Sequence, residues 1–386
     1  MKRTITLLLL LAWAASSFAQ ETPRWIRKNA ISPDGSKIAF SYKGDLFVVS
    51  SNGGRALQVT SNPAYDSDPV WTADSKQLYF SSYREGGKDI FLTSAEGGTP
   101  KRITDYPGAE TPKAVLPDGR IVFVASLQPD VSWGGFPGGT QVYAAGTDGK
   151  MPELLTSVMM PEISVGPDGA ILYENYKGHE DTFRKHHRSA ITRDIWILRN
   201  GQYKQLTTFD GEDRQPVFGP DGDSFYFLSE RDSSTLNVFR SSLSAPGECK
   251  ALTSYQKDPV RYISVATDGT VAYSQNGDLY TVREGSEPRK LDITVWCDEN
   301  EREMTKLNLS NASAMALSPD GKEIAVVIRG DVFVTSTEYP TTRRITNTPS
   351  QERDVCFSKD GRELYYSAER DGCWGVYRSV LGSKSD

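Results

Sequence analysis

The side chains best suited to chemistry are gathered in one segment of the chain, residues 176–196. This segment holds all three histidines of the sequence, and two carboxylates follow the first of them: His179, Glu180, Asp181, His186 and His187. Neutral imidazole and carboxylate groups are ligands for transition metals. However, adjacent side chains in an extended segment point to opposite faces, so His186 and His187 would not share a site. We therefore expect no metal site here.

The basic residues of the same segment predict a different use. A loop that carries several cations attracts a carboxylate or packs on a neighbouring module. We predict a substrate-binding or assembly loop formed by six residues: Arg184, Lys185, His186, His187, Arg188 and Arg193.

The sequence lacks the motifs of common hydrolases and nucleotide-binding proteins. It contains no G-x-S-x-G, no glycine-rich phosphate loop, no H-E-x-x-H and no EF-hand loop. We therefore assign no catalytic residue and expect no cofactor. The four cysteines, Cys249, Cys297, Cys356 and Cys373, have neither C-x-x-C nor zinc-type spacing, which argues against a cysteine metal site. Cys356 and Cys373 are expected on neighbouring strands, and the choice between free thiols and a disulfide stays open.

Eight copies of one short turn sequence, of the type Ser-Pro-Asp-Gly, organise the rest of the chain. Each copy is centred on an aspartate: Asp34, Asp74, Asp118, Asp168, Asp221, Asp268, Asp320 and Asp360. Successive copies lie 40 to 53 residues apart, which is the size of a four-stranded propeller blade. Proline presets the first central position of a turn, aspartate accepts a hydrogen bond from the backbone two residues on, and glycine supplies a positive φ. The turn therefore joins two antiparallel strands.

The residues after each turn predict the remaining strands of a blade. In the first repeat we expect strands at 37–42, 46–49 and 56–60, with a hairpin at 52–54. A threonine recurs at the end of the fourth strand: Thr60, Thr104, Thr156, Thr207, Thr253 and Thr346. One four-stranded meander is too small to be stable alone, whereas radial stacking buries both of its faces. The composition agrees, because 33 Gly, 21 Pro and an aromatic content of 10% favour short strands and turns over helical bundles.

We therefore predict an all-β chain. A six-bladed β-propeller of four-stranded blades spans 20–292, a linker spans 293–312, and the first two blades of a second, incomplete propeller span 313–386. The linker is placed where a polar, charged stretch interrupts the repeat. A single eight-bladed ring is the alternative.

Two acidic stretches, 66–69 and 212–216, precede predicted first strands. The first strands of a propeller surround its axis, so these stretches are expected near a ring face or the central channel. There they either line a pore or cap strand edges.

Residues 1–19 have the features of an export signal. Lys2 and Arg3 precede an apolar run, and Ser17-Phe18-Ala19 offers small residues at the positions that a signal peptidase reads. The run is too short to cross a bilayer comfortably, so we expect a soluble, periplasmic mature chain without a membrane span. The net charge of −6 gives no indication of a nucleic-acid partner.

Several stretches resemble the tricorn protease family. Residues 184–196 look like that family's distinctive fourth-blade sequence. Residues 326–349 resemble the first blade of its second propeller, and residues 351–353 and 369–372 continue the match. The generic blade sequence is shared with TolB-type propellers, which carry PD40-type repeats. The resemblance implies a six-bladed propeller, a seven-bladed propeller, a PDZ-like module and a serine-peptidase module, in oligomers that cut peptides released by larger proteases. The catalytic serine and histidine belong to the last modules, so none is transferred to this chain.

This resemblance predicts the function of the chain. We expect the N-terminal propeller region of an exported tricorn-like serine peptidase, which gates or channels peptides or unfolded polypeptide and supports assembly of a homo-oligomer. The catalytic module is expected to be missing from these 386 residues. The alternatives are a stand-alone periplasmic TolB-like protein-binding propeller and the propeller half of a prolyl-oligopeptidase-like hydrolase.

Overall fold

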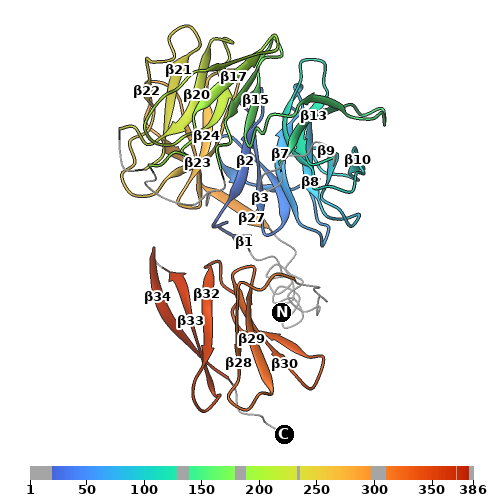
Figure 1. Cartoon of the computed structure of the whole chain (residues 1–386), viewed down its shortest axis with the longest axis vertical. Coiled ribbons are helices and arrows are strands. Elements are labelled where there is room, and N and C mark those ends of the chain that lie inside the picture. The colour runs from blue at the N-terminus through green and yellow to red at the C-terminus, as the bar shows by residue number, and fades with distance from the viewer. Residues whose placement is uncertain are drawn as a thin grey trace, which may run out of the picture. The chain divides into compact units, whose positions relative to one another are not determined.

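The structure is a computed structural model that describes residues 20–127, 139–178, 188–232, 235–296, 310–370 and 372–381. Throughout these residues the chain forms strands, turns and bends, without a helix (Figure 1). It divides into two compact units, Met1–Glu299 and Asn300–Asp386, which we call units 1 and 2.

The described residues of unit 1 contain six four-stranded antiparallel sheets, numbered here in chain order. Sheet 1 consists of β2 (Arg27–Ile31), β3 (Lys37–Tyr42), β4 (Asp45–Ser50) and β6 (Leu57–Gln58). Sheet 2 consists of β7 (Asp66–Trp71), β8 (Gln77–Ser82), β9 (Asp89–Ser94) and β10 (Lys101–Arg102). Sheet 3 consists of β11 (Thr111–Val115), β12 (Ile121–Ala125), β13 (Gln141–Ala145) and β14 (Glu153–Thr156). Sheet 4 consists of β15 (Ile163–Val165), β16 (Ile171–Glu174), β17 (Ile195–Arg199) and β18 (Gln202–Gln205). Sheet 5 consists of β19 (Asp213–Phe218), β20 (Ser224–Ser229), β21 (Asn237–Ser242) and β22 (Lys250–Ala251). Sheet 6 consists of β23 (Val260–Val265), β24 (Val271–Gln275), β25 (Asp278–Val282) and β26 (Arg289–Lys290). The prediction of an all-β fold built from four-stranded sheets is confirmed.

The first strand of each sheet contacts the first strands of the two neighbouring sheets. These contacts join β2 to β7, β7 to β11, β11 to β15, β15 to β19 and β19 to β23, and β23 packs in turn against β2. Across this last junction the Nδ2 of Asn29 donates to the Oγ of Ser274 (2.8 Å), and the backbone N–H of Ile31 donates to the Oγ of Ser264 (2.8 Å). The six sheets therefore close into a ring, with their first strands around its axis.

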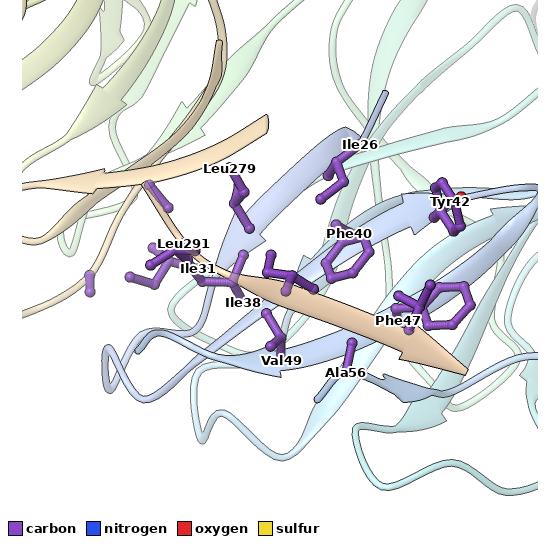
Figure 2. Packing of buried hydrophobic residues seen from close by; sticks show 14 residues of the cluster. Ile26, Ile31, Ile38, Phe40, Tyr42, Phe47, Val49, Ala56, Leu279 and Leu291 are labelled. Atoms are coloured by element: carbon purple, nitrogen blue, oxygen red, sulfur yellow. The ribbon is translucent and has the colours of Figure 1, made fainter. Parts of the chain in front are cut away.

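A hydrophobic cluster fills the junction between sheets 1 and 6 (Figure 2). Its members come from sheet 1, from sheet 6 and from the segment that follows sheet 6, and they include Ile31, Phe40, Phe47, Leu279, Leu291 and Val295. That segment forms β27 (Ile293–Trp296), which pairs in parallel with β5 (Gly54–Arg55) and antiparallel with β1 (Gln20–Glu21). A side chain has no room beside this pairing, since a Cβ at Gly53 would lie 2.7 Å from the backbone oxygen of Asp292.

This pairing changes two details of the sequence prediction. Residues 293–296, predicted to begin a linker, form a strand that ties the end of sheet 6 to sheet 1. The fourth strand of sheet 1, predicted at 56–60, is shorter, because Gly54–Arg55 pairs with β27 and leaves only Leu57–Gln58 beside β4.

The eight predicted turns form with the expected hydrogen bonds. Each turn aspartate accepts a hydrogen bond from the backbone N–H two residues on, at 2.9 to 3.2 Å. The residue after each aspartate has a φ between 60° and 90°, which is why seven of the eight are glycine and Ser75 is the exception.

The recurring threonines join the fourth strand of a sheet to its third. The Oγ1 of five of them accepts a hydrogen bond from a backbone N–H at the start of the third strand, at 2.8 or 2.9 Å: Thr60, Thr104, Thr207, Thr253 and Thr346. Thr156 differs, because its hydroxyl bonds the hydroxyl of Tyr203 (2.8 Å).

Unit 2 contains two further antiparallel sheets in its described residues. One consists of β28 (Ala314–Leu317), β29 (Glu323–Ile328), β30 (Asp331–Ser336) and β31 (Thr342–Arg344), and the other of β32 (Glu352–Phe357), β33 (Glu363–Arg370) and β34 (Cys373–Val380). Buried residues of both sheets pack on one another, among them Val327, Val332, Leu364 and Tyr366.

The prediction that Cys356 and Cys373 lie on neighbouring strands is wrong. Cys356 is in β32 and Cys373 is in β34, and β33 lies between these two strands. The thiols of both residues, and that of Cys249, are free. Cys297 lies outside the described residues.

Candidate functional site

A β-bulge interrupts the first strand of five sheets in the described part of unit 1. The register shifts between Arg27 and Ala30, Ser67 and Val70, Pro112 and Ala114, Arg214 and Val217, and Arg261 and Ser264. A bulge adds a residue that the partner strand does not pair, and so redirects its side chain. At four of these bulges the extra residue is left-handed, with φ between 48° and 57°: Lys28, Asp68, Gln215 and Tyr262.

The residues at the bulges come together with the residue that precedes β15. We call this group the axial cluster; it consists of Lys28, Asp68, Lys113, Glu162, Gln215 and Tyr262, one residue from each sheet or its leading edge. A non-glycine residue with a left-handed backbone is strained, commonly by about 1 to 3 kcal/mol, and such strain is concentrated at functional sites. The bulges therefore mark this cluster as the candidate site.

Ion pairs connect the axial cluster across the ring. The Nζ of Lys28 lies 3.3 Å from Oδ1 of Asp68 and 3.9 Å from Oε1 of Glu162, and the Nζ of Lys113 lies 3.1 Å from Oε2 of Glu162. Lys28 belongs to sheet 1 and Glu162 leads into sheet 4, and these sheets are separated by two others on either side of the ring. Side chains from opposite sides of the ring thus meet across its axis.

The remaining members support this bridge. The ring of Tyr262 lies 5.4 Å from the Nζ of Lys28, a cation–π distance. The side-chain oxygen of Gln215 accepts a hydrogen bond from the backbone N–H of Tyr262 (2.8 Å), which fixes the bulge of β23. The backbone N–H of Gln215 donates in turn to Oε2 of Glu174 (3.0 Å).

The charges of the axial cluster reinforce one another. Burial opposes the charge on Lys28, but the carboxylates of Glu162 and Asp68 raise its pKa above the ordinary lysine value. Burial also opposes the charge on Asp68, but Lys28, Lys88 and Lys113 hold the pKa of this carboxyl well below its usual range. The pKa of Glu162 is lowered by Lys113 and Lys28, against the effect of burial. The three groups are therefore ionised at neutral pH.

A second set of ion pairs lies behind the cluster. Glu174, at the end of β16, has no exposed side-chain surface, and its Oε1 lies 2.9 Å from Nη1 of Arg193 and 3.6 Å from Nη2 of Arg214. Arg193 is 6% exposed. This residue was predicted to belong to a cationic loop, but the structure places it inside unit 1 as the partner of a buried carboxylate.

The other residues of the predicted cationic loop are placed only in part. Arg188 is exposed. Arg184, Lys185, His186 and His187 lie outside the described residues. That these residues form a substrate-binding or assembly loop stays a prediction, since only Arg188 and Arg193 are described.

The two acidic stretches contribute both buried ion pairs and members of the axial cluster. Asp66 and Asp213 are fully buried and pair with Arg84 (2.8 Å) and Arg231 (2.9 Å), which is a structural use. Asp68, from the first stretch, and Gln215, from the second, lie in the axial cluster. Strand capping and lining of the axis thus occur within the same few residues.

The sequence prediction missed Lys28, Lys113, Glu162 and Tyr262. A signal was present, because each member of the axial cluster lies six residues before a turn aspartate, or five in the case of Lys113. Alignment of the repeats on that aspartate identifies the positions. The residue type varies among the repeats, however, with only lysine occurring twice, so no motif indicated a shared role.

The described residues contain no group of His, Cys, Asp or Glu side chains arranged to hold a metal ion. What the axial cluster offers is charge recognition, by two carboxylates, two ammonium groups and an aromatic ring. Such groups bind and position charged ligands without covalent chemistry.

The buried carboxyl group of Glu110 predicts a dependence of stability on pH. Burial raises the pKa of Glu110, which precedes β11, to about 7, while its Oε2 accepts a hydrogen bond from the hydroxyl of Thr104. The folded chain therefore holds this proton more tightly than the unfolded chain, and the contribution of Glu110 to stability falls as pH rises from about 4.5 through about 7. Glu110→Gln, which resembles the protonated acid, should be more stable than the unmodified chain at pH 8, by on the order of 2 kcal/mol, and equal to it at pH 4.5. Urea unfolding at both pH values measures this.

The control for this prediction is Glu96→Gln, since the Glu96 side chain is 72% exposed. It should leave the difference between pH 4.5 and pH 8 unchanged. Equal pH dependence for Glu110→Gln and the unmodified chain would contradict the prediction.

The comparisons with known proteins agree with this geometry. A family model described as "Tricorn protease N-terminal beta propeller domain" matches residues 23–288. The chain belongs to this family. The solved structure described as "Crystal structure of the tricorn protease" superposes with a TM-score of 0.58 at 16% sequence identity, over 93% of this chain and 44% of that chain. This superposition supports the shared fold.

Curated relatives of the tricorn family extend beyond the propeller match. "Tricorn protease homolog 1" of Streptomyces coelicolor is 26% identical over 347 residues, which are 86% of this chain and 31% of that protein. A "Tricorn protease homolog" of Saccharolobus solfataricus is 23% identical over 78% of this chain and 27% of its own length. The Wolinella succinogenes "Tol-Pal system protein TolB" is 24% identical over 51% of this chain and 45% of its own length. The chain thus spans about a third of the first of these tricorn relatives. Nowhere in its described residues does it form a helix long and apolar enough to cross a membrane.

Proposed function

We propose that this chain is the N-terminal propeller region of an exported tricorn-like serine peptidase, and that it gates peptides on their way through the protein without cleaving them. Membership of the tricorn propeller family and the relatives named tricorn protease homologues support this proposal. The serine-peptidase module would lie outside these residues. Export through residues 1–19 into the periplasm and assembly into a homo-oligomer are parts of the same proposal.

One observation carries the gating role: the contact of Lys28 with Glu162 across the ring axis. An extended peptide cannot pass this level while the two side chains meet. Lys28 and Glu162 both have long side chains that point toward one another across the axis. The opening can therefore widen by rotation of these side chains while the six sheets stay in place. A gate of this kind admits an extended chain and excludes a folded domain.

The gating role is tested in the full-length protein with Glu162→Gln. This change removes the cross-axis ion pair and keeps the size of the side chain. We expect hydrolysis of a peptide of about ten residues to become several-fold faster, and hydrolysis of a dipeptide amide to stay within twofold. Glu96→Gln, at an exposed surface position, is the matched control. Unchanged rates for both substrates in a folded Glu162→Gln protein would reject the gate.

The proposal that this chain does not itself cleave peptides has a separate test. Residues 20–386, purified alone, should show no peptidase activity and should not react with a serine-directed fluorophosphonate probe. Labelling at a single serine of this fragment would overturn the proposal that cleavage takes place elsewhere.

A second candidate function is a stand-alone TolB-like binding propeller, which the similarity to TolB proteins favours. The coding sequence after residue 386 distinguishes the two. A peptidase module supports the first proposal, and a stop codon in an intact gene supports the second.

The loop that contains Arg184, Lys185, His186, His187 and Arg188 is proposed to hold a peptide carboxylate or a neighbouring module. Reversal of charge at Arg184 and Arg188 should then weaken peptide capture or reduce oligomer size without unfolding unit 1. Gel filtration and peptide hydrolysis measure both effects, and no change in either would reject this role.

A further inference from the structure

The ammonium group of Lys28 has three contacts, with two carboxylates and an aromatic ring. One oxygen of each of two carboxylates faces it, Oδ1 of Asp68 at 3.3 Å and Oε1 of Glu162 at 3.9 Å. The aromatic ring of Tyr262 lies on it, with its centroid 5.4 Å from Nζ. Two carboxylate oxygens and an aromatic face together balance the charge of an alkylammonium ion.

The second oxygen of each carboxylate is directed to a different cation. Oδ2 of Asp68 lies 3.2 Å from Nζ of Lys88 and also accepts a hydrogen bond from the hydroxyl of Ser67 (2.8 Å). Oε2 of Glu162 lies 3.1 Å from Nζ of Lys113. Neither carboxylate would therefore be left without a cation if Lys28 moved away.

The positions of these lysines separate the exchangeable cation from the fixed ones. The side chains of Lys88 and Lys113 are 16% and 9% exposed, and Lys88 also donates to the Oγ1 of Thr111 (2.9 Å). The side chain of Lys28 is 36% exposed, and its two ion-pair distances are the longest of the four described for Asp68 and Glu162. Lys28 is thus the most exposed of the three cations that face these carboxylates.

We propose that Asp68, Glu162 and Tyr262 form a binding site for an alkylammonium group, which Lys28 occupies in the resting chain. The ammonium group of a peptide, at its N-terminus or on a lysine side chain, replaces the ammonium group of Lys28 there. Exchange of one ammonium group for another conserves the ion pairs of both carboxylates. The exchange also removes the only side chain that joins sheet 1 to Glu162 among the described ion pairs, so the ligand itself opens the axis.

This inference rests on the proposed gating role, since it names the peptide group that the gate recognises. It predicts a preference for peptides with a free amino group over N-acetylated peptides. Binding to the site itself can be measured without peptidase activity, so the two proposals fail separately.

The test is chemical rescue in the 386-residue chain. Lys28→Ala empties the site and leaves room for n-butylammonium. We expect about 20 mM n-butylammonium chloride to raise the melting temperature of this variant by about 2 °C or more, through binding to the folded state. The same concentration of n-butanol or sodium chloride should have no such effect. Lys28→Asn, whose side chain tolerates a left-handed backbone, serves as a second variant with methylammonium as the probe in case the alanine variant does not fold.

Two matched variants make the rescue specific. Lys37→Ala removes a lysine that pairs with the exposed Glu96 (2.6 Å), and it should show no rescue. Lys28→Ala combined with Glu162→Gln should lose most of the rescue. Isothermal titration of Lys28→Ala with Gly-Gly-Phe amide and its N-acetylated form should give an affinity at least tenfold higher for the free amine. Equal rescue of Lys37→Ala, or the absence of rescue in folded Lys28→Ala and Lys28→Asn, would overturn the inference.

Discussion

Val295→Asp is expected to unfold unit 1. Val295 is fully buried in the cluster that joins sheets 1 and 6, and β27 holds it there by pairing with β1 and β5. A carboxylate at this position would lose its hydration without gaining a partner, and the apolar contacts of the valine would be lost as well. Together these effects cost more than about 4 kcal/mol, which is a large part of the stability of a domain. Circular dichroism and urea unfolding of the 386-residue chain measure the loss.

The neighbouring residue provides the control for this prediction. Thr294 is in the same strand, but its side chain is only partly buried, because alternate residues of a strand point to opposite faces. Thr294→Asp should therefore cost less than about 1 kcal/mol. If the two variants were equally stable, β27 would not hold the junction of the ring.

The contrast between the turns and β27 explains how far the sequence could predict the fold. The turn at Asp34 and the threonine at 60 act within one sheet, on residues close in the chain, so their spacing was sufficient to place strands. β27 instead pairs with Gly54–Arg55, about 240 residues earlier, and no turn sequence joins the two. The alternation Ile-Thr-Val-Trp at 293–296 was consistent with a strand, but its partner could be identified only in three dimensions.

The axial cluster was hidden for a related reason. A bulge places its side chain on the axis through a backbone conformation, with φ near 50°, and residues as different as Lys28, Gln215 and Tyr262 adopt it. Since the ring brings six sheets to one axis, complementary charges can come from any two repeats. Lys28 and Glu162 are 134 positions apart, and no opposite charge stands beside either of them in the sequence.

Arg193→Met is expected to destabilise unit 1 by about 3 kcal/mol or more. The change leaves the fully buried carboxylate of Glu174 without its closest cation, which lies 2.9 Å away. Arg214 remains at 3.6 Å and the backbone N–H of Gln215 still donates to Oε2, so the loss should fall short of that for an isolated buried charge. Urea unfolding gives the free-energy difference.

A double variant separates the buried charge from the packing of the arginine. Arg193→Met combined with Glu174→Gln removes the carboxylate together with its closest cation. It should recover more than half of the stability lost in the single variant, because the buried carboxylate is gone and Arg214 keeps Glu212, whose Oε2 lies 4.0 Å from its Nε. Arg188→Met, five residues away at an exposed position, should change stability by less than about 0.5 kcal/mol. The sequence placed both arginines in one cationic loop. If Arg193→Met proved as mild as Arg188→Met and weakened peptide capture instead, that assignment would be correct for Arg193. A large loss of stability that Glu174→Gln restores means that Arg193 serves to neutralise the buried carboxylate next to the axial cluster. The recognition of peptides is then left to the axial cluster itself.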